Sequence, residues 1–323
     1  MRSHLESVNC DGTEIRIRGK TLRVPSVQID GRTVVSWGRW LKTAGVRDEG
    51  LVEGDTVENP DSFIRKLKQS DLKADIFTFA QKIPDTEPKY SFPMQMDNVA
   101  AVCLDDPKDW WENRLPQETR KNVRRSAKRG VITKIQDLDD ALVKGICDIY
   151  SETPVRQGRR FWHYQKDFET VRREVSTYLE RSTFVCAFYE GELIGFIKTA
   201  RVGKVAEMIH ILSKAGHQDK KPTNALIAKA VEYFAKQGYS HLTYGKYEYG
   251  NKTKNSLTEF KQRNGFQKIL VPRYHVPLTP RGRICMALGL NRDMVEILPE
   301  LLIAPLTKLR NKWYRWQFSR RPV

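Results

Sequence analysis

The segment Thr183-Phe-Val-Cys-Ala-Phe-Tyr189-Glu-Gly-Glu-Leu193-Ile-Gly-Phe-Ile-Lys-Thr199 holds two apolar runs on either side of Glu190-Gly191-Glu192. Because Gly191 can take a positive φ, the segment predicts an antiparallel hairpin. The sequence that follows predicts a strand over 207–212, a helix over 223–237 that ends at Gly238, and a strand over 241–244. This order is typical of a mixed α/β layer with one crossover connection.

The sequence on the N-terminal side of this core predicts further elements. An apolar run at 99–104 precedes a basic helix over 116–128, which ends at Gly130, where a left-handed residue is needed. A strand over 131–135, a helix over 139–153 and a helix over 167–180 follow.

Residues 1–97 carry their own structural signals. Alternation over 14–35, with the turn pair Asp30-Gly31, predicts short strands. Asn59 and Pro60 are typical of a helix start, and residues 74–80 predict a buried strand. Three prolines at positions 84, 88 and 93 mark a linker. We therefore expect three parts, 1–97, 98–280 and a basic amphipathic tail over 281–323.

Composition limits the class of protein. With 40% hydrophobic and 29% charged residues, the 323-residue chain is expected to fold around a packed core. The five cysteines are scattered and never form a CxxC pair, which favours a reducing compartment and neither a disulfide framework nor a zinc site. No signal peptide and no run of about 18 apolar residues is found, so we expect a cytoplasmic protein. The net charge of +17 predicts contact with polyanions.

Three features together resemble the GNAT superfamily of acyltransferases and its FemAB-like branch. They are the strand order with the turn at Tyr189–Gly195, the basic segment Thr119–Val131 and the segment Glu259–Phe266, which is similar to a Phe-Lys element of that branch. The resemblance covers residues 98–278. It implies a mixed α/β fold with a complete GNAT-like C-terminal lobe and a reduced GNAT-like lobe in 1–97.

The resemblance also implies an acyltransferase in which an acceptor amine attacks an activated acyl carbon directly. Such a transfer needs a gap between two diverging strands, where main-chain amides hold the carbonyl. We expect this gap between the strands at 207–212 and 241–244, whose ends lead into polar segments.

The acyl donor stays open between aminoacyl-tRNA and acyl-CoA. Acetyl-CoA-dependent GNAT enzymes carry a Gln/Arg-x-x-Gly-x-Gly/Ala loop for the pyrophosphate, and the segment Ser213–Asn224 lacks that spacing. FemAB-type enzymes also lack the loop and use aminoacyl-tRNA. No tightly bound cofactor and no metal site is expected. The candidate donor-binding residues are Ser213, Gly216, Lys220, Lys221 and Asn224.

Two residues are the catalytic candidates. Lys261 matches the lysine of the Phe-Lys element, where the resemblance implies that an ammonium stabilises an oxyanion or holds a phosphate. Tyr244 follows the last core strand, and its phenol could protonate a leaving group. A surface lysine and an ordinary strand-end tyrosine are the alternatives. Lys246 and Phe260 are added as substrate-binding candidates.

Guanidinium groups alternate with aromatic rings at 156–164, a pattern suited to phosphate binding with ring stacking. The alternative is a hydrophobic clasp in which the aromatic residues pack and the arginines stay solvated. The candidate acceptor-binding residues of this segment are Arg156, Arg159, Arg160, Phe161, His163 and Tyr164.

Two basic segments are candidates for polyanion contact. The helix at 116–128 carries Arg120, Lys121, Arg124, Arg125 and Lys128, which predict a tRNA or nucleotide footprint. A solvated face paired with Asp137, Asp139 and Asp140 is the alternative. The tail at 294–323 interleaves basic and aromatic residues, which predicts peripheral contact with an anionic membrane or, alternatively, a docked helix.

The expected function is N-acyl transfer of an acyl or aminoacyl group to an amine of a phosphorylated sugar or cell-envelope-type precursor. The acceptor would be a nucleotide- or lipid-linked sugar, and the enzyme would be cytoplasmic or membrane-associated. Three alternatives remain: an acetyl-CoA-dependent N-acetyltransferase acting on an amino sugar, a non-catalytic tRNA- or RNA-binding protein, and a membrane-peripheral scaffold anchored by the tail.

Overall fold

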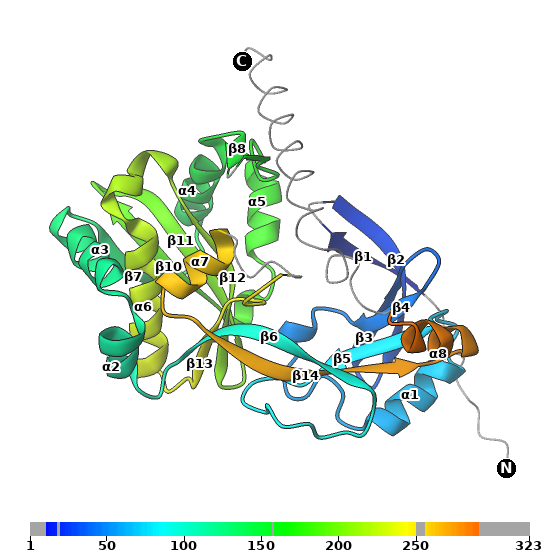
Figure 1. Ribbon diagram of the computed structural model, residues 1–323. Helices are drawn as coiled ribbons and strands as arrows, with labels where there is room; N and C mark the ends of the chain where they lie inside the picture. The colour runs from blue at the N-terminus through cyan, green and yellow to red at the C-terminus, as the bar shows by residue number, and fades with distance from the viewer. Residues whose placement is uncertain (1–10, 18–19, 157, 250–255, 291–323) are drawn as a thin grey trace. The chain divides into compact units, whose positions relative to one another are not determined.

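The computed structural model describes residues 11–290 except 18–19, 157 and 250–255 (Figure 1). The tail at 294–323, with its predicted membrane contact, lies outside the described residues. The chain divides into two units. Within the described part, residues 11–98 and 270–290 form the first unit and residues 99–269 form the second. Among the described residues, no helix combines the length and apolar character needed to cross a bilayer.

The first unit is a mixed sheet whose core is aromatic. Its strands run in the order β1-β2-β3-β4-β5-β14, antiparallel except for the parallel pair β4–β5. Four aromatic rings pack together in the core of this unit, those of Phe63, Phe77, Phe79 and Tyr274. The elements are β1 (Asp11–Ile17), β2 (Lys20–Ile29), β3 (Arg32–Trp37), β4 (Thr43–Val46), η1 (Glu49–Leu51), α1 (Pro60–Gln69), β5 (Ile76–Ala80), β14 (Gln267–Pro277) and α8 (Pro280–Ala287).

The second unit is also a mixed sheet, with strand order β6-β13-β12-β11-β10-β7. Every neighbouring pair is antiparallel except β12–β13, which is parallel. The strands are β6 (Met94–Cys103), β7 (Ile132–Gln136), β10 (Ser182–Tyr189), β11 (Glu192–Val202), β12 (Val205–Ser213) and β13 (His241–Thr243). A mixed α/β fold was predicted, and the structure confirms it.

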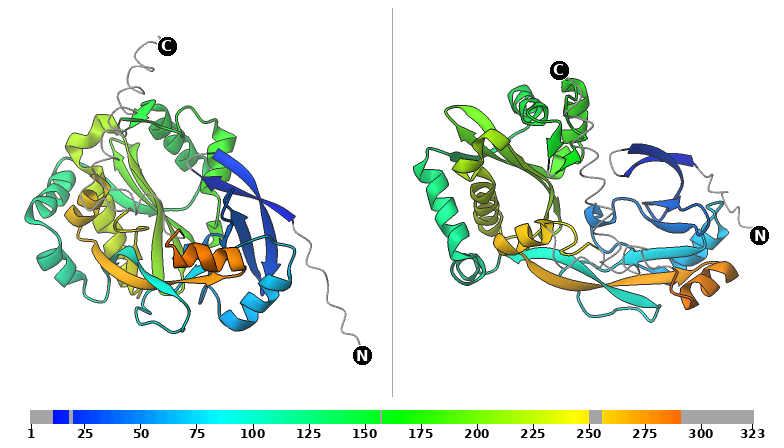
Figure 2. Two further views of the ribbon diagram at one scale, coloured as in Figure 1. Left: turned by 45° about the vertical axis from the view of Figure 1, so that its right-hand side comes forward. Right: turned by 45° about the horizontal axis from the view of Figure 1, so that its top comes forward.

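Helices cover both faces of this second sheet (Figure 2). One face packs against α6 (Pro222–Lys236), which in turn packs against α3 (Gln117–Lys128). The other face packs against α4 (Asp140–Ser151) and α5 (Phe168–Val175). Because both faces are covered, eight consecutive β11 residues from Leu193 to Ala200 are buried, including the polar residues Lys198 and Thr199.

Shorter elements connect these layers. They are α2 (Pro107–Asp109), η2 (Trp110–Arg114), β8 (Val155–Arg156), β9 (Arg159–Arg160), η3 (Leu179–Arg181), η4 (Ala215–Lys220) and α7 (Ser256–Arg263).

Most helices and strands were predicted correctly from capping and turn residues in the sequence. Asn59 caps α1 through a bond from Ser62 N to Asn59 Oδ1 of 3.1 Å, and Pro60 is the first helical residue. Glu190 and Gly191 take φ of 50° and 82° in the predicted hairpin turn. Two predictions were wrong. The helix expected over 167–180 ends at Val175, since Tyr178 turns left-handed, and the loop expected at 156–164 contains the hairpin β8–β9.

Three helices of the second unit end in the same way. Each of α3, α6 and α7 is followed by a glycine with positive φ, whose N–H donates to the carbonyl three residues earlier. The residue after the glycine donates its N–H to the carbonyl five residues earlier. This is the pattern of a Schellman cap, which satisfies the last carbonyls of a helix. The glycines are Gly130, Gly238 and Gly265.

Gly265 and Gly238 form a matched pair for a stability test. Alanine at Gly238 meets no atom within 4 Å, so it should cost only about 1–2 kcal/mol for the left-handed backbone. Alanine at Gly265 places Cβ 2.6 Å from Trp110 Nε1, which should add about 1–3 kcal/mol of overpacking. Urea unfolding of G265A and G238A measures the difference, and equal losses would contradict the prediction.

Candidate functional site

The two central parallel strands pair over only three residues. Val205–Glu207 of β12 pairs with His241–Thr243 of β13, and β12 then continues to Ser213 paired with β11 on its other side. The chain after β13 stays with β6, because Tyr244 N donates to Ala100 O and Ala100 N donates to Gly245 O, both at 2.8 Å. The sheet therefore forks beyond Glu207, and the predicted separation of the strands is confirmed.

A β-bulge lies in the separated part of β12. Its register with β11 shifts so that Thr199 faces Met208 and Lys198 faces His210, leaving Ile209 as the extra residue. A bulge disrupts the ladder locally and leaves the extra residue unpaired. Beyond Glu207, the described pairing of β12 with β13 has ended, and main-chain groups on that side of β12 are candidates for contact with a substrate carbonyl.

Glu207 lies at the branch point of the fork. Its carboxylate accepts hydrogen bonds from Gly245 N, at 3.0 Å from Oε1, and from Thr243 Oγ1. Burial raises the pKa of Glu207, while the bonds from Thr243 and Gly245 and the charge of Lys261 act in the opposite direction. The sequence analysis placed Glu207 in a strand and gave it no role. An acidic residue inside an otherwise apolar strand was the signal that could have found it.

Lys261 of α7 is fully buried, with 0% of its surface exposed, so the surface-lysine alternative is wrong. Its Nζ donates to Lys246 O and lies 4.9 Å and 5.0 Å from the ring centroids of Tyr244 and Tyr249. Burial lowers the pKa of Lys261 to about 8, against the opposing charge of Glu207. The ammonium form still predominates at pH 7 and supplies a desolvated positive charge.

The aromatic candidates form the wall around Lys261. The Phe260 ring meets Tyr244 edge-on at 6.2 Å. Burial raises the pKa of Tyr244 to about 12, so its phenol stays protonated at neutral pH. The structure therefore brings together four residues predicted from the sequence, Tyr244, Lys246, Phe260 and Lys261, and adds Glu207 to them.

The candidate donor segment begins where β12 ends, and protein groups engage much of it. The Glu152 carboxylate accepts from the amides of Ala215 and Gly216, the latter at 2.8 Å. Ser213 Oγ lies 3.0 Å from Thr223 Oγ1, and Asn224 Nδ2 donates to Asn264 Oδ1 at 2.9 Å. Lys220 Nζ lies over the Tyr189 ring, and Lys221 is left-handed before α6.

Arg156 joins the candidate acceptor segment to the end of β12. Its guanidinium donates to Ser213 O at 2.8 Å, to Ile149 O at 3.1 Å and to Glu152 Oε2 at 3.1 Å. It also lies over the Phe161 ring at 4.9 Å. These contacts hold Arg156 within the protein.

The rest of the acceptor segment is divided between core and surface. Phe161 packs edge-on against Tyr150, and His163 is 6% exposed. Trp162 is 46% exposed, so only part of the hydrophobic clasp is formed. Arg160 is exposed and Tyr164 is half-buried, while Arg159 lies in β9 with its side chain outside the described part.

A buried polar cluster follows the bulge. His210 Nδ1 lies 3.2 Å from Tyr150 Oη, and the His163 and His210 rings stack at 5.0 Å. Beside them Lys166 Nζ bonds both oxygens of Glu174 at 2.7 Å and 2.8 Å. Burial, together with the nearby positive charge of Lys198, lowers the pKa of His210 to about 4.

The basic helix α3 presents most of its cations to solvent. Lys121, Arg124, Arg125 and Lys128 are exposed, whereas Arg120 donates to Glu112 O at 2.7 Å. Two of the three acids expected to neutralise this helix are engaged elsewhere. Asp139 caps α4 at Leu142 N, and Asp140 pairs with Arg172 at 2.8 Å.

Among the residues with described positions, no cluster of three or more His, Cys, Asp or Glu suits a metal ion.

Comparison with known proteins gives the family of the forked unit. Residues 144–256 match the model of the acetyltransferase (GNAT) family. The chain contains a GNAT acyltransferase domain. A search of curated proteins gives no match.

Solved structures with a similar fold align with most of the chain, beyond the residues that match the family model. The crystal structure of FemX is similar with a TM-score of 0.56 at 11% identity, covering 87% of this chain and 91% of that one. L-PGS from Bacillus licheniformis is similar with a TM-score of 0.51 at 13% identity, covering 80% and 85%. The predicted GNAT fold is confirmed, and the likeness to FemX and to L-PGS is one of fold.

The protonation of His210 predicts acid sensitivity. Burial lowers its folded pKa to about 4, below the 6.5 of the unfolded chain, so the unfolded state binds the proton first. Its contribution to stability is complete above pH 6.5 and is lost as the pH falls towards 4. The loss should reach about 3 kcal/mol.

The matched variant is His210→Asn, which keeps an acceptor near the Tyr150 hydroxyl but does not titrate in this range. Urea unfolding at pH 7 and pH 4.5 should show a smaller pH dependence for H210N than for the unchanged protein. Identical pH dependence would exclude His210 as the responsible group.

Proposed function

We propose that the GNAT domain transfers an acyl or aminoacyl group to an amine of a phosphorylated sugar or cell-envelope-type precursor, at the fork between β12 and β13. The observation that carries the proposal is the three-residue pairing of these strands, followed by the bulge at Ile209. This arrangement offers main-chain groups to a carbonyl without a rearrangement of the sheet.

The reaction needs few side chains. The acceptor nitrogen attacks the acyl carbon to form a tetrahedral intermediate, and the bond from that carbon to the donor's carrier oxygen or sulfur then breaks. The nitrogen loses one proton to a base, and the leaving oxygen or sulfur gains one, so that the products are an amide and an alcohol or thiol. The Lys261 ammonium is the fixed positive charge at the fork, suited to a developing oxyanion or a substrate phosphate. Because it is already desolvated, its charge is not screened by bulk water.

Glu207 is the candidate acceptor of the amine proton. Its raised pKa brings the carboxylate nearer to the basicity that a general base requires. Each carboxylate oxygen can accept more than one hydrogen bond, so the bonds from Thr243 and Gly245 leave acceptor capacity. Those two bonds also fix the orientation of the carboxylate.

The donor segment favours a donor other than coenzyme A. The Ala215 and Gly216 amides are held by the Glu152 carboxylate, whose charge would repel a pyrophosphate there. An aminoacyl-tRNA agrees better with the exposed cations of α3 and with the net charge of +17. The acetyl-CoA-dependent alternative requires Glu152 to release these amides.

A ligand panel tests for a nucleotide-linked acceptor and for coenzyme A as the donor carrier. A ligand that binds only the native state raises its melting temperature. A UDP-amino sugar should therefore raise the melting temperature, whereas coenzyme A at the same concentration should leave it unchanged. Inorganic pyrophosphate controls for charge alone. Stabilisation by coenzyme A, without an effect of the UDP-amino sugar, would support the acetyl-CoA-dependent enzyme instead.

Lys261→Met tests the catalytic assignment, because methionine keeps most of the side-chain volume and removes the charge. Turnover should fall by about a hundredfold or more, the usual effect of losing one oxyanion donor. The control is Lys268→Met, which removes an exposed lysine paired with Glu248. Product formation from aminoacyl-tRNA or acyl-CoA with the amino sugar is followed by mass spectrometry, and urea unfolding checks stability. Full activity in K261M would contradict a catalytic role for Lys261.

A further inference from the structure

The bulge in β12 changes the face of the sheet on which the following side chains lie. Successive side chains of a regular strand alternate between the two faces. Ala206 and Met208 belong to the apolar core under α6, and Glu207 between them lies on the opposite face. Without the bulge, His210 would therefore follow Met208 into the core under α6.

The extra residue at the bulge instead places His210 on the face of Glu207. The His210 ring stacks on His163 and meets Phe196 edge-on, both at 5.0 Å between ring centroids. Phe196 belongs to the core under α4 and α5, on the side opposite to α6. A bulge redirects a side chain in this way at many functional sites.

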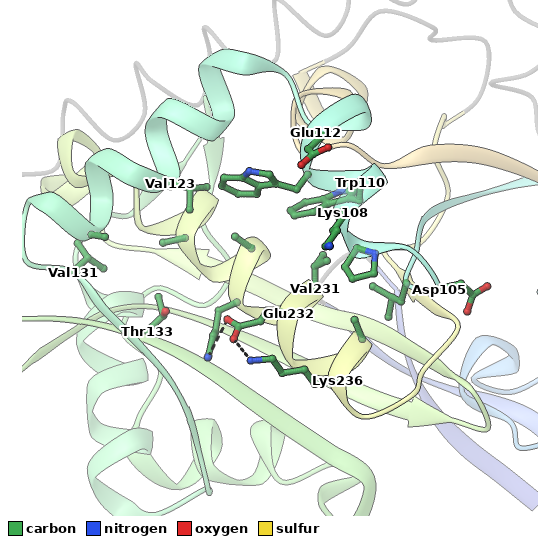
Figure 3. A pocket seen from close by; sticks show the side chains of 18 residues that line it. Asp105, Lys108, Trp110, Glu112, Val123, Val131, Thr133, Val231, Glu232 and Lys236 are labelled. Carbon is green, nitrogen blue, oxygen red and sulfur yellow. Dashed lines mark hydrogen bonds and ion pairs between the residues drawn. The ribbon is translucent and has the colours of Figure 1, made fainter.

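The face that His210 avoids is the apolar side of the sheet. A groove of about 640 Å³ lies there between α3 and α6 (Figure 3). Small residues such as Ala127 and Ala228 line it, together with Val231 of the core under α6. An imidazole directed to this side would lose its polar partners, which is costly for a buried polar group. The bulge thus gives His210 a polar environment.

Glu207 and His210 are close neighbours on their shared face. Glu207 pairs with Ala200 of β11, and His210 pairs with Lys198, two residues away on the same strand. Positions two residues apart on a strand are separated by about 7 Å. One small group of a substrate could therefore contact both side chains at once.

The two ring nitrogens of His210 differ in their surroundings. Nδ1 lies 3.2 Å from Tyr150 Oη. Nε2 has no hydrogen-bond partner within the described part of the chain, and it is not one of the enclosed polar atoms there, so it is open to a ligand. Because burial lowers the pKa of His210 to about 4, the ring is neutral at pH 7. When Nδ1 donates its proton to Tyr150, Nε2 presents a lone pair.

We propose that His210 is a further acceptor-binding residue of the fork, whose Nε2 accepts a hydrogen bond from the attacking amine. A neutral primary amine has two N–H groups and one lone pair. With one N–H bonded to Glu207 and the other to His210, the lone pair has a fixed direction for attack on the acyl carbon. Glu207 remains the group that takes the proton. The inference rests on the proposed acyl transfer at the fork.

Two variants of His210 separate this role from a structural one. His210→Gln places its amide near the position of Nε2, whereas His210→Asn places it near Nδ1 and keeps a partner for Tyr150. H210N should raise the KM for a UDP-amino sugar about tenfold, the effect of one lost hydrogen bond, and leave the KM for the acyl donor unchanged. H210Q should restore most of the affinity. The opposite order would show that His210 only supports Tyr150 and would overturn the proposal.

His241→Asn is the matched control. His241 begins β13, at the paired end of the two strands, and its Nδ1 lies 3.1 Å from Ser240 Oγ. H241N should leave both KM values unchanged. Urea unfolding of H210N, H210Q and H241N identifies any variant whose kinetics reflect a loss of folded protein.

A labelling experiment on the unchanged protein needs neither a variant nor turnover. Diethyl pyrocarbonate modifies accessible neutral imidazoles, and peptide mass spectrometry locates the product. We expect modification of His210 at pH 7, slowed by a UDP-amino sugar and much less by its N-acetylated form, whereas His163, which is 6% exposed, should stay unmodified. An unreactive His210, or equal protection by both sugars, would overturn the proposal. Selective protection without any transfer would support the contact with the amine and count against the acyl transfer alone.

Discussion

The fork in the second sheet lies where two strand pairings diverge. β12 remains paired with β11, while the chain after β13 remains paired with β6 through Tyr244, Gly245 and Ala100. The Glu207 carboxylate bridges the two sides at the branch point by accepting from Thr243 and Gly245. Because a buried carboxylate must be satisfied, these bonds fix the path of the chain that carries Tyr244.

The same carboxylate makes a buried ammonium tolerable. Lys261 is fully buried, and its charge is balanced by Glu207, by the Lys246 carbonyl and by two tyrosine rings. If one of the two charged groups is removed, the other remains buried without an opposite charge. This loss destabilises the fold by more than the intact pair stabilises it. The position of the Lys261 ammonium therefore depends on the path of the chain after β13. This dependence places a positive charge at the fork, where the proposed chemistry needs one.

The two faces of the forked sheet are built differently. On the face covered by α4 and α5, polar groups penetrate the core, with His210, Tyr150 and Arg156 linked to the end of β12. On the face covered by α6, the core is apolar, and small residues on α3 and α6 leave an open groove. One sheet therefore separates a face with buried polar groups from a face whose core is apolar.

The sequence by itself determined the elements whose signals are local: the hairpin around Gly191, the cap at Asn59 and the glycine that ends α6. It also gave Lys261, through resemblance, together with its neighbours Tyr244 and Phe260. It could not give the contact of Glu207 with Gly245, which are 38 residues apart, or of Arg156 with Ser213, which are 57 apart. Turns and caps depend on a few consecutive residues, whereas these contacts depend on strand register and on where a pairing stops. Only the folded sheet decided that Glu207 marks the branch of the fork and that α3 and α6 leave a groove, because both follow from packing between distant segments.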